Sequence, residues 1–373
     1  MSDTGLPEPD RIEGAPHPRE TPHLFGQAGA EAAFLQAHAS GRLHHGWLLT
    51  GPRGVGKATL AWRIARFLLA TPPEDGSGLF DAPPPPETLD IAPDHPVSRR
   101  LLALSEPGLF LLRRGPTDKG DKLSNDIRVD TVRKLANFLQ LSATDGGRRV
   151  VIVDCADEMN TQAANALLKM LEEPPARTFF LMISHQPTGL LPTIRSRCRE
   201  LRLGPLSAPD MARALEQAGI GEIENPAALT ELSAGSVGEA IRLITLGGVQ
   251  IYADLVALYS RLPDLDRPRA LRLAEGAAAR GATARLDLLL ALTDLLLARL
   301  ARSGATGQPP QVEAAPGEAA LLARLAPGPA RARAWADVAQ QISARTTHGR
   351  AVNLDPAALV LDTVFRIQKT AGG

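Results

Sequence analysis

A glycine-rich loop that ends in lysine is the first feature of this sequence that could do chemistry. The run Gly51-Pro52-Arg53-Gly54-Val55-Gly56-Lys57 follows a short apolar stretch and precedes a helical pattern. Glycines let backbone N–H groups turn inward around phosphate oxygens, and the start of a helix adds partial positive charge. Lysine would reach the terminal phosphates, and only six of the 41 basic residues are lysine. The pattern predicts a P-loop, with a ligand-free glycine turn as the alternative.

The residues around this loop depart from what ATP hydrolysis needs. The pattern requires Ser or Thr after the lysine because that hydroxyl ligates Mg²⁺, and here the residue is Ala58. Thr59 lies one residue further on, rotated by about 100° around the helix. Asp154 follows an apolar run and could hold Mg²⁺ through water, but Cys155 stands where an active ATPase places Glu to polarise the attacking water. We predict a nucleotide-binding site without hydrolysis, and ATP binding itself stays open. Its residues are Gly51, Gly54, Gly56, Lys57, Thr59 and Asp154.

Alternating apolar runs and amphipathic stretches would position these residues between about Leu24 and Leu203. The predicted strands share a short apolar pattern and lie at 47–49, 109–112, 150–153, 179–183 and 200–203. The predicted helices between them share a helical apolar period and lie at 58–69, 130–141 and 161–173. Strands that alternate with helices favour a parallel sheet covered on both faces.

The remaining segments set the expected domains. Strand signals stop after Gly204-Pro205, and Ser207 with Asp210 predicts a capping box that opens a helix. We therefore expect four parts: a disordered leader at 1–20, an α/β P-loop domain at 21–204, a small helical lid domain at 205–247 and an all-α domain at 248–373. Residues 71–96, rich in proline, read as an irregular surface loop, and Ser303–Pro316 reads as a link between two helical halves.

Composition excludes several classes of protein. Basic and acidic residues balance at 41 each, so no strong overall field draws the chain to a polyanion, and contact with nucleic acid must be local or shared. Only two cysteines occur, Cys155 and Cys198, which excludes a disulfide framework and fits a reducing cytosol. The first residues lack an apolar signal core, and no uncharged run reaches the ~20 residues of a membrane span. We expect a soluble, cytoplasmic protein with no membrane partner.

Two segments together resemble the AAA+ clamp-loader ATPases. The first, Thr161–Pro175, reads TQAANALLKMLEEPP, and the second, Leu190–Cys198, ends in Ser-Arg-Cys. That family carries an NALLK-LEEPP helix followed by a Ser-Arg-Cys motif. Three further segments support the resemblance, which covers about residues 20–370: Leu24–Gln27, His44–Trp47 and Asn353–Pro356.

The resemblance implies a fold, partners and a catalytic residue. The expected fold is an α/β P-loop AAA+ domain with a parallel sheet, a helical lid domain and an all-α collar domain that holds five subunits together. The implied partners are the motor subunits called tau and gamma and the delta subunit of the DNA polymerase III clamp loader. Contact with the sliding clamp and primer–template DNA would come through the complex. Arg197 would reach the ATP of an adjacent motor subunit. The alternative is that Arg195, Arg197 and Arg199 merely solvate a sheet end.

Departures from the family pattern bear on activity. Motor subunits carry Asp-Glu where this chain has Asp154-Cys155, and a sensor arginine where it has Gly238, so the chain resembles the non-hydrolysing type of subunit. Ser184 lies near the other sensor position, as a phosphate contact or a strand-end cap. Many members hold zinc through four cysteines after the P-loop helix; this chain has none there, so we predict no zinc. Two other functions stay open: an active AAA+ motor, and an adaptor outside replication.

Overall fold

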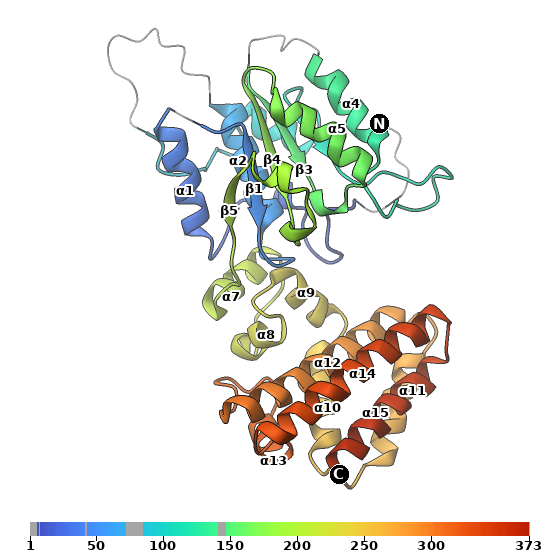
Figure 1. Cartoon of the computed structure of the whole chain (residues 1–373). Coiled ribbons are helices and arrows are strands. Elements are labelled where there is room, and N and C mark those ends of the chain that lie inside the picture. Colours follow the sequence, from blue (N-terminus) through green and yellow to red (C-terminus); the bar gives the residue numbers. More distant parts are fainter. Residues whose placement is uncertain (1–5, 7, 42, 72–84, 141–146, 373) are drawn as a thin grey trace. The chain divides into compact units, whose positions relative to one another are not determined.

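A computed structural model describes residues 6, 8–41, 43–71, 85–140 and 147–372 (Figure 1). The chain divides into two compact units, one of Met1–Glu222 with Ser236–Gly238 and the other of Ile223–Gly235 with Glu239–Gly373. The expected boundaries after residues 204 and 247 fall between secondary-structure elements but do not delimit these units. The division into lid and collar domains therefore stays a prediction.

The first unit contains a parallel five-stranded sheet. Its strands are β1 (Gly46–Thr50), β2 (Leu109–Leu112), β3 (Arg149–Val153), β4 (Thr178–Ile183) and β5 (Arg199–Arg202). They lie in the order β2-β3-β4-β1-β5, and every neighbouring pair is parallel. All five predicted strands are confirmed, with ends that differ by one residue at most. This order places the segment after β1 beside the segment after β4, with the segment after β3 next to that.

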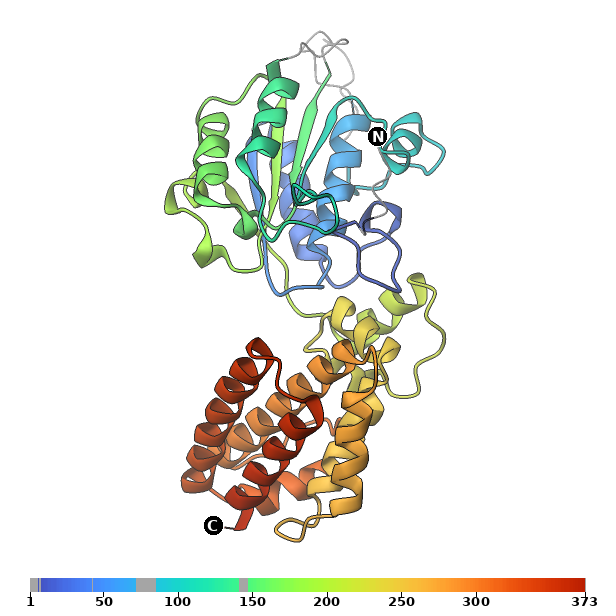
Figure 2. The ribbon, with the colours of Figure 1, turned by 90° about the vertical axis from the view of Figure 1, so that its right-hand side faces the viewer.

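Helices cover both faces of the sheet. In this unit they are α1 (Ala28–Ala39), α2 (Lys57–Ala70), α3 (Pro96–Leu102), α4 (Val129–Gln140), α5 (Thr161–Glu172), α6 (Pro192–Arg195) and α7 (Ala208–Gln217). Figure 2 shows α4 and α5 on one side of the sheet and α2 on the other. Leu135 of α4 and Leu167 of α5 pack in one buried cluster with Val151 of β3. The predicted helices at 58–69 and 161–173 are confirmed, as is the one at 130–141 up to Gln140.

The N-terminal segment differs from the expected disordered leader. Residues 8–20 are folded, with a short 3-10 helix at Pro18–Glu20 and with His17 fully buried. The His17 ring meets the Trp62 ring of α2 edge-on, with 5.8 Å between centroids, and Arg66 of α2 donates to the Arg19 carbonyl oxygen. Polar contacts with residues distant in the sequence hold this segment in place. The pattern of residues within the segment does not reveal such contacts.

The proline-rich segment at 71–96 is only partly described, since residues 72–84 lie outside the described residues. Its described part, 85–95, contains no helix or strand. Helix α3, which begins at Pro96, was not predicted; His95 caps it by accepting a hydrogen bond from the Val97 N–H. A helix of seven residues that begins with a proline gives too short a periodic pattern to recognise.

The second unit consists of helices. They are α8 (Pro226–Leu232), α9 (Val237–Thr245, whose first two residues belong to the first unit), α10 (Gly248–Tyr259), α11 (Arg267–Ala278), α12 (Thr283–Thr306), α13 (Glu318–Leu325), α14 (Pro329–Ala351) and α15 (Pro356–Gly372). Helix α12 packs along α14, and α11 packs along α15. The link expected from Ser303 begins four residues later, because α12 continues to Thr306 and Gly307 ends it at a φ of 68°.

Of the capping box predicted at Ser207, the N-cap hydrogen bond is present: the Ser207 side chain accepts the Asp210 N–H. Among the described helices, none is by itself long and apolar enough to cross a membrane; only the bent pair α9 and α10 passes that test jointly, by length and composition.

Candidate functional site

The glycines of the predicted P-loop are required by its backbone. Gly51, Gly54 and Gly56 have φ values of 137°, 77° and 102°, a region that other residues rarely adopt. A Cβ atom at Gly51 would lie 2.2 Å from the Leu203 carbonyl oxygen, and one at Gly54 would lie 2.3 Å from the Ser236 hydroxyl oxygen. The loop joins β1 to the first turn of α2, the place from which a helix N-terminus faces an anion.

Lys57 folds back onto its own loop. Its ammonium group donates to the carbonyl oxygens of Gly51, at 2.7 Å, and of Pro52. The residue is 3% exposed, and burial lowers the pKa of the ammonium group to about 8. A phosphate would compete with these two carbonyl oxygens for the same donor.

The first turn of α2 contains Ala58 and Thr59, both half-buried. Within the described part of the chain, no hydrogen bond joins the Thr59 hydroxyl to Lys57 or Asp154. The structure thus brings the glycine-rich loop, Lys57 and Asp154 together, but within the described residues it gives Thr59 no hydrogen bond to Lys57 or Asp154. Nucleotide binding by these six residues stays a prediction.

Asp154 lies at the end of β3, where sequence reasoning placed it. Burial, reinforced by the nearby carboxylates of Asp10 and Glu158, raises the pKa of Asp154 to about 7. A carboxyl group that binds its proton near neutral pH is a weak ligand for Mg²⁺ unless the metal displaces the proton. Arg113 and Arg53 partly offset this shift.

Cys155 pairs with a histidine instead of presenting a carboxylate. Its Sγ atom lies 3.3 Å from Nε2 of His185, and its backbone is left-handed at a φ of 54°. Burial, together with the Asp154 charge, raises the thiol pKa, and burial with the nearby Lys57 charge lowers the His185 pKa to about 4. Both groups are therefore neutral at pH 7, and the thiol donates to Asp154 Oδ1 at 3.9 Å. A neutral thiol does not activate water as a carboxylate does.

The acidic residues that follow Cys155 are committed to other contacts. Asp157 accepts a hydrogen bond from the His185 backbone N–H at 3.0 Å, and Glu158 forms an ion pair with Arg114 at 2.9 Å. Ser184, after β4, is fully buried, and its hydroxyl has no hydrogen-bond partner within the described residues. Its hydroxyl therefore does not cap the strand end, which leaves a phosphate contact as the remaining expectation.

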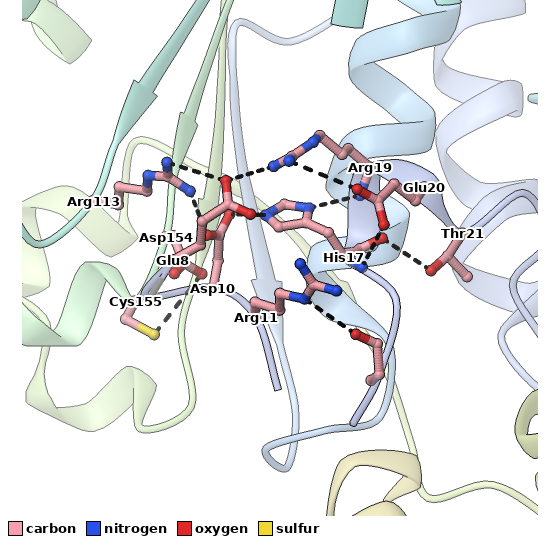
Figure 3. A network of polar contacts seen from close by, with 11 residues as sticks. Glu8, Asp10, Arg11, His17, Arg19, Glu20, Thr21, Arg113, Asp154 and Cys155 are labelled. Carbon is pink, nitrogen blue, oxygen red and sulfur yellow. Dashed lines mark hydrogen bonds and ion pairs between the residues drawn. The ribbon is translucent and has the colours of Figure 1, made fainter. Parts of the chain in front are cut away.

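The folded N-terminal segment reaches this site, as Figure 3 shows for Asp10 beside Asp154. His17 accepts the Arg19 N–H on Nδ1, so its proton lies on Nε2, 3.1 Å from Asp10 Oδ2. Arg113, just after β2, pairs with Asp10 as well. Although burial opposes it, the hydrogen bond from His17 and the Arg113 charge lower the pKa of Asp10. Sequence reasoning missed this network, whose only local signal is the capping pair of His17 and Glu20.

The position expected for a sensor arginine is tightly enclosed. The Gly238 N–H donates to the Gly54 carbonyl oxygen at 3.2 Å. A Cβ atom at Gly238 would lie 3.2 Å from Gly54 Cα and 2.5 Å from Cδ1 of Ile12, which belongs to the N-terminal segment. An arginine at Gly238 would have to displace Ile12.

Arg197 lies outside this cluster, in the turn between α6 and β5. Its guanidinium group forms an ion pair with Glu172 of α5 at 2.8 Å and donates to the Thr193 carbonyl oxygen at 3.0 Å. Its side chain is 36% exposed. The neighbouring Arg199 stacks over the Trp47 ring, so the three arginines of this segment have different surroundings.

Strand direction separates Arg197 from the P-loop. Arg197 precedes β5, whereas the P-loop follows β1, and the two strands are parallel with Trp47 opposite Arg199. The two features therefore lie at opposite ends of these strands, on the order of 15 Å apart at ~3.3 Å per residue. Arg197 does not reach its own P-loop.

Comparison with known proteins finds relatives that match part of this chain. The family model described as "DNA polymerase III, delta subunit" matches residues 26–207. DNA polymerase III subunit delta-prime of Pseudomonas aeruginosa is 37% identical over 58% of this chain and 60% of that protein. The Escherichia coli K12 subunit of the same name is 31% identical over 56% of this chain and 57% of that protein. The chain is thus similar to DNA polymerase III delta-prime subunits over somewhat more than half of its length.

A gamma/tau subunit, that of Mycobacterium tuberculosis H37Rv, is 31% identical over 54% of this chain and 32% of that protein. The chain spans about three fifths of the length of the two delta-prime relatives. A solved gamma-subunit-related protein from Thermotoga maritima aligns with 91% of this chain and 99% of that one, at 16% identity and a TM-score of 0.36, which is too low to support a conclusion.

Proposed function

We propose that this chain is a non-hydrolysing subunit of a DNA polymerase III clamp loader. It takes its place beside tau/gamma motor subunits and a delta subunit, and acts through the complex on the sliding clamp and primer–template DNA. Its own site either binds ATP without hydrolysing it or binds no ATP. The protein needs no zinc. Arg197 acts in trans on the ATP of a neighbouring motor subunit.

The pairing of Cys155 with His185 supports the loss of hydrolysis. The thiol at the strand end is uncharged, buried and already engaged at 3.3 Å with an uncharged imidazole. Ala58 supplies no hydroxyl for Mg²⁺ at the start of α2. Two groups that an ATPase needs are thus absent from one site, and each alone would slow the reaction strongly.

Arg197 lies at the end of the strands opposite the P-loop, and this position supports the proposal that it acts in trans. Its guanidinium group is partly exposed, and its one carboxylate partner, Glu172, is itself 43% exposed. An ion pair with this exposure contributes at most about 1 kcal/mol, so an incoming phosphate can replace it. An arginine at the γ-phosphate of a neighbour offsets charge that develops as the bond breaks, worth ~10³–10⁵ in rate in other NTPases.

Reconstitution of the complex with Arg197→Ala tests this role. We expect normal folding and assembly, because the ion pair to Glu172 stabilises little, together with reduced DNA- and clamp-stimulated ATPase and reduced clamp loading. The loss in total turnover should be smaller than the single-site factor, because only one motor site faces this subunit. Arg197→Lys should fail as well, because an ammonium group does not reproduce the planar fork.

The neighbouring arginines provide the controls for this experiment. Arg195→Ala removes the arginine at the end of α6, and Arg199→Ala removes one that stacks on Trp47. Both should retain most of the stimulated activity. An Arg197→Ala complex that loads clamps at the wild-type rate would rule out the trans role.

An active motor is the second candidate, because the chain is 31% identical to a gamma/tau subunit over 54% of its length. The isolated protein should show no ATPase above background with Mg²⁺. Turnover near ~1 s⁻¹ that disappears in Lys57→Ala would favour the motor, since typical enzyme rates begin around that value. Binding of a fluorescent ATP analogue, measured in parallel, would show whether the site retains nucleotide without turnover.

A further inference from the structure

A groove on the second unit is lined by three arginines. It has a volume of about 280 Å³ and lies between α10, α11 and α12. Its lining residues are Ile251, Asp254, Arg269, Arg272, Leu273, Gly276, Ala277, Arg285 and Leu289. Within the described residues, the guanidinium groups of Arg269, Arg272 and Arg285 make no hydrogen bond or ion pair.

Helical spacing explains why these residues share one groove. On α11 the lining positions 269, 272, 273 and 276 follow the i, i+3, i+4, i+7 pattern of a single helix face. Ile251 on α10 and Leu289 on α12 are 2% and 3% exposed and form an apolar floor. The arginines stand above this floor: Arg272 and Arg285 are exposed, and Arg269 is half-buried. A Cβ atom at Gly276 would meet nothing within 4 Å, so the groove is open beside that residue.

The charge in the groove is unbalanced. Asp254 is its only acidic residue and already accepts a hydrogen bond from the Gln250 side chain at 3.2 Å. Three guanidinium groups against one carboxylate leave an excess of two positive charges in a chain whose overall charge is zero. An anionic partner would satisfy donors that otherwise bind only water.

We propose that this groove binds an acidic segment of a partner protein. An aliphatic side chain of that segment lies on the floor, and flanking carboxylates bind Arg269, Arg272 and Arg285. An apolar anchor within a charged rim is the usual organisation of a peptide site. Single-stranded nucleic acid fits less well, because none of the nine lining residues is aromatic. The proposal is independent of the trans role of Arg197.

Fluorescence anisotropy with the full-length protein tests the proposal. The probe is fluorescein-labelled Gly-Glu-Glu-Leu-Glu-Glu-Gly at low salt, and saturable binding below about 1 mM is expected. Replacing Glu by Gln in the peptide, or Leu by Gly, should weaken binding at least ~10-fold and ~5-fold, respectively. Absence of saturable binding would refute the proposal.

Substitutions at exposed residues locate the binding. Arg272→Glu and Arg285→Glu should each weaken binding about 10-fold, since each replaces an attraction by a repulsion. Arg333→Glu on α14 has the same charge change outside the groove and should have little effect. Asp254→Asn should strengthen binding. If both groove reversals bind as tightly as the wild type, the groove is not the site.

Filling the groove separates shape from charge. Gly276→Leu places a side chain in open space and should abolish binding while the protein stays folded by circular dichroism, whereas Gly276→Ala should bind nearly as the wild type does. A seven-nucleotide single-stranded DNA of mixed sequence is the competing probe. If the DNA binds more tightly than the peptide, and Arg272→Glu and Gly276→Leu abolish its binding, the groove is a nucleic-acid site and the peptide proposal is wrong.

Discussion

At the scale of single residues, burial in the degenerate site shifts the pKa values of Lys57, Asp154, Cys155 and His185 toward their neutral forms. Asp154 shows the consequence most directly, because its pKa of about 7 lies well above the usual value for Asp. A carboxyl group with a raised pKa in the folded state leaves the protein most stable below the unfolded-state pKa of about 4. Stability is then lost as the pH rises through about 7, where folding forces an unfavourable buried charge.

Replacing Asp154 by Asn should therefore raise the free energy of unfolding relative to the wild type, and by more as the pH rises. Between pH 5 and pH 8 the variant should gain on the order of 2 kcal/mol in unfolding free energy relative to the wild type. Urea denaturation at both pH values measures this. A Trp335→Phe background leaves Trp47 and Trp62 as reporters, and both are buried in the first unit. An equal difference between the two proteins at pH 5 and pH 8 would contradict the raised pKa.

At the scale of elements, one buried carboxylate holds the connection between α12 and α13. Glu318 is fully buried and accepts hydrogen bonds from Arg299 Nε at 2.6 Å, from the Ala314 N–H at 2.7 Å and from the Tyr252 hydroxyl. Burial and the hydrogen bond to Glu318 raise the pKa of Tyr252, which stays a donor. This carboxylate joins α10, α12, α13 and the link between them.

Glu318→Ala should destabilise the second unit by about 3 kcal/mol, because it leaves the buried Arg299 without its main partner. For a unit of this size the loss corresponds to a melting temperature lower by on the order of 10 °C, measured by circular dichroism at 222 nm. Tyr252→Phe removes one donor and should cost about 1 kcal/mol. If Glu318→Ala melts with the wild type, the carboxylate does not hold the link.

At the scale of the whole molecule, the two compact units suggest where the chain can be cut. A chain of residues 1–222 keeps all five strands and α1–α7, whereas one of residues 1–246 also keeps α8 and α9 without the rest of their unit. We expect the 1–222 chain to fold but to fail to join tau/gamma and delta subunits, if the C-terminal helices form the proposed collar. The 1–246 chain should aggregate, because Leu229 and Leu243 lose their surroundings.

Gel filtration with the partner subunits distinguishes these outcomes. Co-elution of the 1–222 chain with the complex would contradict the collar, and a monomeric, cooperatively melting 1–246 chain would contradict the grouping of α8 and α9 with the C-terminal helices. Circular dichroism of the 1–222 chain provides the control for its folding.

The sheet and the glycine-rich loop could be predicted from the sequence alone, because each depends on residues close together along the chain. A strand buried on both faces appears in the sequence as a short apolar run, as in Val150–Val153, and the loop glycines between β1 and α2 have a fixed spacing. The absence of a hydroxyl at Ala58 and of a carboxylate at Cys155 is equally local. These features predicted a degenerate nucleotide site before any contact was known.

Only the tertiary structure decided which distant residues meet. The strand order β2-β3-β4-β1-β5 brings Cys155 to His185, and the folded N-terminal segment brings Asp10 to Asp154. Arg197 pairs with Glu172. It lies at the end of the strands opposite the P-loop because β1 and β5 are parallel. Such contacts join residues tens of positions apart through single hydrogen bonds and charges, which leave no periodic trace in the sequence. The pattern of residues along one element shows which of them are buried, whereas the order of the strands decides which residues of different elements meet.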